Sequence, residues 1–453
     1  MTLAAPPPIP RAAGSLPFLG HAIQLMHDNL GFTTSLRRRY GPLVEITLQP
    51  GTRTLVVQEP ALIRTMLTDL APTLDKGRLF DKMGQLLGES VITVAGQDHV
   101  RKRRQLQPAL GRAEIAGYVD VMRGQATEAV DSWRPGQRLD VRDTMVKLSL
   151  DMLTQTIFSG SLDADTFRRL QQNIVVVMDG VGVRLILPDW VERLPLPYNR
   201  RFMRARDAVH ATVSEAVTGL RATGHDTGDM LSMLLRAKDE STGLPLSDQQ
   251  ICSEILTLAV AGTETTATVF AWTMYELARH PDIEARVLAE LHEVLGARPV
   301  TFDDIPALPY LNRVVTEILR LHHMGWIVTR RTLTETRLGE WTLPAGTDLA
   351  YCQHALHRDP EYYPEPLKFD PDRWLDDRQK PPPGSFLPFG AGKHKCMGDR
   401  FAMTELTTGL ATILRRVRLE LAPGQTVRPV GRATARPGKM MMTVRERGEF
   451  AAG

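Results

Sequence analysis

The feature that most constrains the fold is a long, largely apolar stretch from Ser247 to His280, which keeps helical periodicity throughout. Ser247 is a suitable N-cap, and Gln250, three residues later, completes a capping-box pattern. At 1.5 Å per residue, such a helix is roughly 50 Å long. A helix that long and that apolar must be surrounded by other elements, so we expect a large, mainly helical core.

Polar residues interrupt the centre of this helix, at residues 261–266 (Ala-Gly-Thr-Glu-Thr-Thr). Gly262 lowers helix stability, and buried hydroxyl and carboxylate groups need partners. We therefore interpret this stretch as functional. The alternative is a helix face whose polar side chains are satisfied within the fold.

A second region of interest is residues 389–398 (Phe-Gly-Ala-Gly-Lys-His-Lys-Cys-Met-Gly), called here the cysteine loop. Its glycines allow a sharp turn and a close approach to a flat cofactor. A helix is predicted over 399–415, with one apolar face formed by Phe401, Leu406, Leu410 and Ile413. Cys396 then lies just before a helix N-terminus, which stabilises a thiolate. We interpret it as an iron ligand; the alternative, an inert buried cysteine, is disfavoured by the Lys-His-Lys that precedes it.

The pattern Phe-x-x-Gly-x-(Arg or His)-x-Cys-x-Gly at 389–398 resembles the haem-binding signature of the cytochrome P-450 superfamily. The segments 96–104, 261–266, 317–320 and 371–374 resemble the same family at the expected places. The resemblance covers nearly the whole chain. It implies a mainly α fold with a minor β portion, in which haem is buried between the long central helix and the helix after the cysteine loop.

The resemblance also assigns the cofactor residues. Cys396 is expected to bind the iron of haem b (iron protoporphyrin IX) as a thiolate. His99 and Arg103, four residues apart, are expected at a haem propionate, with a solvated basic helix face as the alternative. Arg330 is assigned to the other propionate, although its neighbour Arg331 fits nearly as well. Phe389, His394 and Gly398 complete the set, and His394 stands where many members have arginine.

Glu264 and Thr265 correspond to the family's acid and alcohol on the oxygen side, where a kink at the glycine makes room for O2. Thr265 is expected to position a water or bound peroxide, and Glu264 to connect proton delivery to solvent. A glutamate in place of the more frequent aspartate leaves the relay route open. The expected reaction inserts one oxygen atom into a C–H bond. Glu317, Arg320 and Arg373 are expected to form a buried structural network.

The substrate pocket is assigned by resemblance to segments 80–87, 186–194, 258–265, 324–328 and 439–441. Its selected lining residues are Phe80, Leu87, Leu258, Ala261, Trp326, Ile327 and Met440. These are mostly apolar, which suits a bulky hydrophobic substrate. The spacing around 194–202 resembles actinobacterial oxygenases of cyclic sesquiterpenes such as pentalenene, so a terpene is the leading hypothesis. A fatty-acid or macrolide hydroxylase stays open, as does a non-oxygenating haem-thiolate isomerase or haem sensor. His322 and His323, which replace a proline-containing sequence, are interpreted as surface residues.

Composition narrows the remaining possibilities. The chain has 453 residues, a net charge of +3 and three cysteines with no close pair, which disfavours a nucleic-acid partner and a disulfide framework. We expect a proline-rich lead-in and first helix over 1–36, and one haem-thiolate domain over 37–453. The first ten residues lack a membrane anchor, so a cytoplasmic bacterial monomer is expected.

A haem domain of this length leaves no room for a flavin or iron-sulfur module, so electrons are expected from a ferredoxin and an NAD(P)H-dependent ferredoxin reductase. A docking patch for the ferredoxin, or else an ordinary solvated surface, is formed by Lys393, Lys395, Arg400, Arg101 and Arg104. The few predicted strands are 43–48 and 53–58, a hairpin that turns at Pro50-Gly51, and 337–343 and 347–352.

Overall fold

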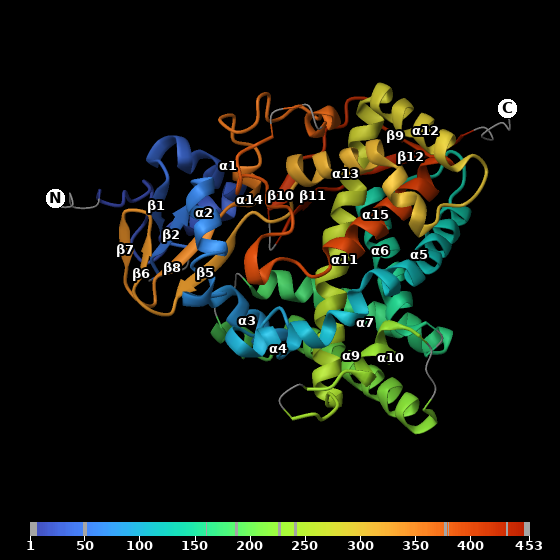
Figure 1. Ribbon diagram of the computed structural model, residues 1–453, viewed down its shortest axis with the longest axis horizontal. Coiled ribbons are helices and arrows are strands. Elements are labelled where there is room, and N and C mark those ends of the chain that lie inside the picture. Colours follow the sequence, from blue (N-terminus) through green and yellow to red (C-terminus); the bar gives the residue numbers. More distant parts are fainter. Residues whose placement is uncertain are drawn as a thin grey trace. The chain divides into compact units, whose positions relative to one another are not determined.

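The computed structural model describes residues 7–48, 52–159, 161–185, 189–224, 228–239, 242–375, 378, 380–431 and 434–447 (Figure 1). The chain forms two compact units. Unit 1 contains Met1–Lys82, Glu317–Cys396 and Thr434–Arg436; unit 2 contains Met83–Thr316, Met397–Ala433 and Pro437–Gly453. Each unit is described by itself.

Unit 1 is built on a five-stranded sheet of order β1-β2-β8-β5-β3. The pairs β1/β2, β5/β8 and β3/β5 are antiparallel, and β2/β8 is parallel. Its apolar core includes Leu43, Ile63, Leu349 and Tyr351. The elements of unit 1 are α1 (Ala22–Tyr40), β1 (Leu43–Ile46), β2 (Thr54–Val57), α2 (Pro60–Leu67), η1 (Ala71–Thr73), β3 (Leu74–Asp75), β5 (Val328–Thr332), β6 (Thr336–Leu338), β7 (Trp341–Leu343), β8 (Asp348–Tyr351), α14 (Gln353–Leu356), η4 (Pro371–Trp374) and η5 (Gly392–His394).

The predicted hairpin of 43–48 and 53–58 is confirmed by β1 and β2, although the predicted turn at Pro50-Gly51 lies outside the described residues. The prediction of one strand over 337–343 is wrong. Two short strands, β6 and β7, form an antiparallel hairpin there. Gly339 has a φ of +58°, a left-handed conformation that glycine adopts at little cost and that reverses the chain between the two strands.

Unit 2 is mainly helical. Its elements are α4 (Gly96–Leu106), η2 (Pro108–Leu110), α5 (Arg112–Ser132), β4 (Arg138–Asp140), α6 (Val141–Phe158), α7 (Ala164–Arg184), α8 (Asp189–Glu192), α9 (Pro197–Thr223), α10 (Met230–Arg236), α11 (Asp248–Arg279), α12 (Pro281–Leu295), η3 (Phe302–Ala307), α15 (Asp399–Leu414), β9 (Val417–Leu421), β10 (Pro429–Gly431) and β12 (Met441–Glu446). Three elements contribute residues to both units: α3 (Arg78–Leu87), α13 (Pro309–Leu321) and β11 (Ala435–Pro437). The strands β4, β12 and β9 form an antiparallel sheet in that order.

The long helix predicted from the sequence is confirmed as α11, which packs against α6, α7, α9 and α15 (Figure 1). Its capping box is present: the Gln250 amide donates to Ser247 Oγ at 3.3 Å, and the Ser247 amide donates to Gln250 Oε1 at 2.8 Å. Of the described helices, α11 is long and apolar enough to cross a membrane, but 67% of its most apolar window is buried, which fits a core helix.

α11 runs without interruption through the glycine at which a kink was expected. A Cβ at Gly262 would lie 2.8 Å from Leu153 Cδ2 on α6. The glycine therefore permits close packing of α11 on α6. The helix predicted over 399–415 is confirmed as α15, and its apolar face is buried, as predicted. α1 runs across the boundary predicted between residues 36 and 37.

Candidate functional site

The cysteine loop is a tight turn in unit 1. The Cys396 amide donates to the Phe389 carbonyl at 2.8 Å, which closes the loop. Gly390 and Gly392 have φ values of +70° and +65°. A Cβ at Gly392 would lie 1.8 Å from the Leu67 carbonyl oxygen, so only glycine fits where the loop crosses the end of α2.

Buried histidines hold the segment that leads into the cysteine loop. His323 Nδ1 accepts from the Gly325 amide at 2.9 Å, and its Nε2 lies 3.1 Å from the Pro388 carbonyl. His357 Nε2 accepts from the Leu387 amide at 2.9 Å. Burial lowers the pKa of His323, and lowers that of His357 further, so both rings are neutral near neutral pH. The interpretation of His323 as a surface residue is wrong, because it supports the loop from within the fold.

The three cysteines differ in accessibility. Cys252 and Cys352 are buried, and burial raises the pKa of their thiols to about 11 and about 12. Cys396 is exposed. It lies two residues before Gly398, the N-cap of α15, where the helix dipole favours a negative charge. Among the three, Cys396 is the thiol available to a metal.

Arg330, on β5, is a buried cation. The residue is 5% exposed, its Nη1 donates to the Thr329 carbonyl at 2.7 Å, and burial lowers its pKa. Within the described parts of the chain it has no carboxylate at ion-pair distance, whereas Arg331 pairs with Asp348 at 2.8 Å. Burial and the Arg330 charge also lower the pKa of the half-buried Lys393. Asp75 acts on the Arg330 charge from beyond ion-pair distance and offsets it only in part, so this corner of unit 1 suits a further anionic group.

On the oxygen-side helix, one accessible stretch interrupts a long buried run. From Ile251 to Leu277, α11 is buried except at residues within Leu258–Thr265, called here the central window. The half-buried residues are Leu258, Val260, Ala261, Gly262, Glu264 and Thr265. The predicted acid and alcohol therefore lie where α11 offers surface to a ligand.

A buried carboxyl group that the sequence analysis missed lies behind this window. Glu405, on α15, is 1% exposed, and burial raises its pKa to about 8. Its Oε1 lies 3.1 Å from the Thr266 hydroxyl, which lies 2.9 Å from the Gly262 carbonyl. Both contacts are satisfied when a protonated Glu405 donates to Thr266, which donates to Gly262. The sequence signal that could have revealed this group is a glutamate directly before Leu406, in a helix with an apolar face.

The Thr265 hydroxyl, one residue before Thr266, donates to the Ala261 carbonyl at 2.9 Å. Its oxygen lone pairs are then the part of the group that can accept a hydrogen bond from a ligand.

On α4, His99 is buried and Arg103 is half-buried, one turn apart. The face that carries His99 is therefore not a solvated one.

The predicted structural network comes together in unit 1. Arg320 donates to both Glu317 oxygens, at 2.7 and 2.8 Å, and Arg373 Nε lies 3.5 Å from Glu317 Oε1. The Trp374 indole adds a bond to the same carboxylate at 3.0 Å. Arg320 also donates to the carbonyls of His357, Pro366 and Lys368.

The predicted pocket residues differ in exposure. Phe80, Ile327, Leu258 and Ala261 are half-buried, whereas the others are buried: Leu87, Trp326 and Met440. Trp326 belongs to a core cluster with Leu30 and Ala435. Of the predicted segment 186–194, residues 186–188 lie outside the described part of the chain.

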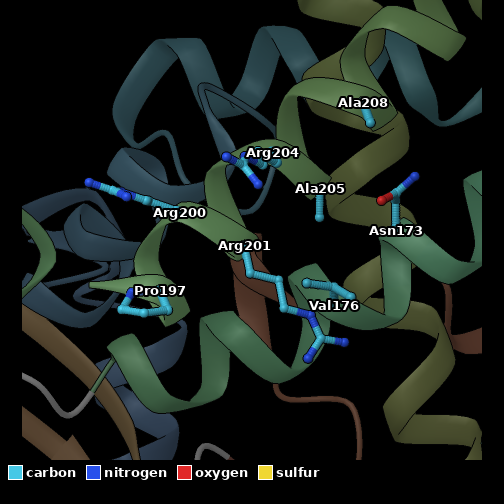
Figure 2. Close-up of a pocket in the computed structure, with 8 residues that line it drawn as sticks. All are labelled: Asn173, Val176, Pro197, Arg200, Arg201, Arg204, Ala205 and Ala208. Atoms are coloured by element: carbon cyan, nitrogen blue, oxygen red, sulfur yellow. The ribbon is translucent and has the colours of Figure 1, made fainter. Parts of the chain in front are cut away.

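A groove of about 570 Å³ lies between α7 and α9 in unit 2, and none of the selected pocket residues lines it (Figure 2). Arg201, Arg204 and Ala205 come from α9, Asn173 and Val176 come from α7, and Arg200 points away from the centre (Figure 2). The lining of the groove is cationic and differs from the apolar pocket expected for the substrate.

Among the predicted docking residues, Arg101 pairs with Asp98 at 2.8 Å and with Asp239 at 3.3 Å.

The helical fold, the cysteine loop and the buried cation define a haem-thiolate protein. The cytochrome P450 family model matches residues 7–444. The chain is 42% identical to cyclooctat-9-en-7-ol 5-monooxygenase of Streptomyces melanosporofaciens over 93% of each chain. It is 35% identical to pentalenene oxygenase of Streptomyces avermitilis over 97% of this chain and 98% of that one. The solved heme domain of cytochrome P450DA superposes with a TM-score of 0.86 at 26% identity, covering 98% of this chain and 99% of that one.

The chain belongs to the cytochrome P450 family and is a monooxygenase with a haem-thiolate cofactor. Such an enzyme uses O2, redox partners and a hydrophobic substrate. The residues present fit the cofactor: Cys396 is an accessible thiol before a helix N-terminus, and Arg330 is a buried cation that suits a carboxylate. Gly392 allows the backbone turn that brings the thiol to the surface of unit 1.

Proposed function

We propose that this protein hydroxylates, or oxidises in successive steps, a bulky cyclic terpene in secondary metabolism. The observation that carries the proposal is the similarity, over nearly the whole chain, to two oxygenases whose names state pentalenene and an unsaturated cyclic alcohol as substrates. The apolar character of Leu258 and Ala261 in the central window supports a hydrocarbon-like substrate.

For the cofactor we propose haem b. Cys396 would bind its iron as a thiolate, with backbone amides near Gly398 tuning the sulfur. Arg330, His99 and Arg103 would bind its carboxylates. Phe389 and His394 complete the proposed set, and a neutral His394 would donate a single hydrogen bond. When bound, haem supplies the activation of O2 and the transfer of one oxygen atom to a C–H bond.

The oxygen side is proposed to work through proton transfer along α11. Thr265 Oγ1 would accept a hydrogen bond from a water in the central window and hold it in place. Glu264, half-buried beside it, would carry protons from solvent to that water. Thr265→Ala should lower the fraction of NAD(P)H that ends in product by about tenfold. Thr268→Ala, a buried threonine on the same helix, is the control and should leave this fraction unchanged; equal losses in both variants would contradict the assignment.

The proposed partners are a ferredoxin and an NAD(P)H-dependent ferredoxin reductase, in the cytoplasm, with the enzyme as a monomer. Lys395, in the cysteine loop, and Arg400, two residues after it, are exposed and are proposed to meet acidic groups of the ferredoxin. Lys395→Glu should slow reduction by ferredoxin at low ionic strength, while reduction by dithionite stays unchanged. Lys380→Glu, a charge reversal elsewhere on the surface, is the control.

The substrate class is tested by optical titration of the ferric protein with cyclic terpene hydrocarbons, cyclic terpene alcohols, fatty acids and macrolide precursors. A shift from low to high spin with the terpenes alone supports the proposal; a shift only with fatty acids or macrolides contradicts it. Ala261→Phe, which fills the central window, should weaken terpene binding by about tenfold. Val175→Phe adds the same ring on the exposed face of α7 and should not. Binding without turnover would favour the isomerase or sensor alternative.

A further inference from the structure

A buried ion pair joins α4 to α11 in unit 2. Lys102 Nζ lies 3.0 Å from Glu254 Oε1, and the two side chains are 5% and 3% exposed. Both Glu254 oxygens also accept from the Val91 amide, at 3.1 and 3.0 Å. One carboxylate on α11 therefore holds α4 and the segment that precedes it.

That preceding segment has little freedom to move away from α11. A Cβ at Gly88 would lie 2.6 Å from Ser253 Oγ, so the backbone approaches the helix closely beside Glu254. The Thr93 hydroxyl donates to the Gly88 carbonyl at 2.8 Å and accepts from the Ser90 amide at 2.8 Å. The bonds of Glu254 are thus made to a stiff segment.

The position of the pair connects two proposed parts of the site. Glu254 precedes Thr265 by eleven residues, or three helical turns, so both lie on the same face of α11, roughly 16 Å apart along its axis. Lys102 directly precedes Arg103 and follows His99 by three residues. The pair therefore fixes the turn of α4 that carries both proposed carboxylate ligands to the helix that carries the proposed oxygen-side residues.

Stability alone does not account for the pair. Burying two charges costs several kcal/mol per ion, and apolar side chains of similar volume often stabilise a fold as well or better. Glu254 also neutralises a cation that directly precedes Arg103 in the chain.

We propose that Glu254 is a positioning residue that acts through Lys102: the ion pair sets how His99 and Arg103 hold the haem carboxylates. The inference rests on the proposed function of these two residues. It predicts that Glu254 controls retention and electronic properties of the haem without touching it.

The test uses the full-length, haem-loaded protein and its Glu254→Gln variant. Transfer of haem to apomyoglobin should be about tenfold faster in the variant, as is typical when groups that orient metal-site ligands are lost. The reduction potential should move in the positive direction, because the Lys102 charge is no longer neutralised. Glu284→Gln is the matched control. Glu284 is also a buried glutamate, paired with Arg418 at 3.3 Å and with Arg447. That variant should lose thermal stability without faster haem transfer or a changed potential.

Two further variants separate positioning from packing. Lys102→Arg retains the charge and should stay close to the wild type in both measurements. The double variant Lys102→Met/Glu254→Met removes both buried charges and should regain thermal stability while haem transfer remains fast. Wild-type haem transfer in Glu254→Gln, or in the double variant, would overturn the inference. If the haem-loaded wild type did not show the spectrum of thiolate-bound haem, the proposed function would be overturned instead.

Discussion

Glu405 is a buried carboxyl group of unit 2 whose protonation depends on the fold. Its pKa is about 8 in the folded protein, against an ordinary value of 4.5, because burial disfavours the charged form. The folded state therefore binds more protons than the unfolded state between these values. The stabilising contribution is complete below the unfolded value, and it is lost as the pH rises through the folded value.

Glu405→Gln removes this titration and keeps a group, the side-chain amide, that can donate to Thr266. Compared with the wild type, the variant should gain on the order of 1–3 kcal/mol of unfolding free energy near pH 9 and much less near pH 6. Thermal melts of the haem-loaded proteins at the two pH values test this. Glu420→Gln, on the edge strand β9, where Glu420 pairs with Arg445 at 2.8 Å, is the control. An equal gain for Glu405→Gln at both pH values would contradict the buried, protonated carboxyl.

The need for glycine in the cysteine loop can be tested with a second glycine, outside the loop, as the control. Gly392 and Gly346 both have positive φ, +65° and +81°, so alanine at either position costs about 1 kcal/mol in backbone strain. Only at Gly392 would the new Cβ meet backbone, the Leu67 carbonyl oxygen. Gly392→Ala should therefore abolish the thiolate absorption spectrum, whereas Gly346→Ala should retain it. If both variants kept the spectrum, the close approach of the cysteine loop to the end of α2 would not require glycine at position 392.

At the scale of elements, the sequence predicted the helix whose ends and buried face are set by local interactions. The periodicity and the Ser247 cap fix α11 within one residue at each end, because capping and apolar spacing act within a few residues. β5 was missed: its sequence, Val-Thr-Arg-Arg-Thr, lacks the apolar alternation of a half-buried strand, and pairing with β8 and β3 decides its conformation. The same strand settles which arginine is buried, since residues 330 and 331 alternate across it.

The network around Glu317 predicts different costs for one chemical change. Arg320 makes two bonds to Glu317 and three to backbone carbonyls, all inside the fold, whereas Arg373 contacts the carboxylate once, at 3.5 Å, and makes its two carbonyl bonds, to Pro364 and Glu365, at the surface. Lysine keeps the charge but loses the planar fork of donors. Arg320→Lys should therefore cost about 3 kcal/mol or more, and Arg373→Lys about 1 kcal/mol. Chemical denaturation of the haem-loaded variants measures both; equal losses would show that Arg320 holds no special place.

At the scale of the whole molecule, the family and the local motifs were predictable, and the contacts between distant segments were not. The cysteine loop is a contiguous motif, so its sequence alone indicated a metal-binding thiolate. Glu405 meets Thr266 across 139 residues, and Lys102 meets Glu254 across 152. Nothing local marks such pairs, because either partner reads as an ordinary helix residue until the fold brings them together. The lining of the substrate pocket was the hardest part to predict, because the exposure of Leu87 and Met440 depends on how several elements pack around them.

The central claim is that Cys396 binds haem iron as a thiolate. Its most direct test is the absorption spectrum of the reduced, CO-bound protein, with Cys396→Ser compared against Cys252→Ser, a buried cysteine on α11. The account predicts the long-wavelength band of thiolate-bound haem in the wild type and in Cys252→Ser, and its loss in Cys396→Ser. Retention of that band in Cys396→Ser would contradict the account.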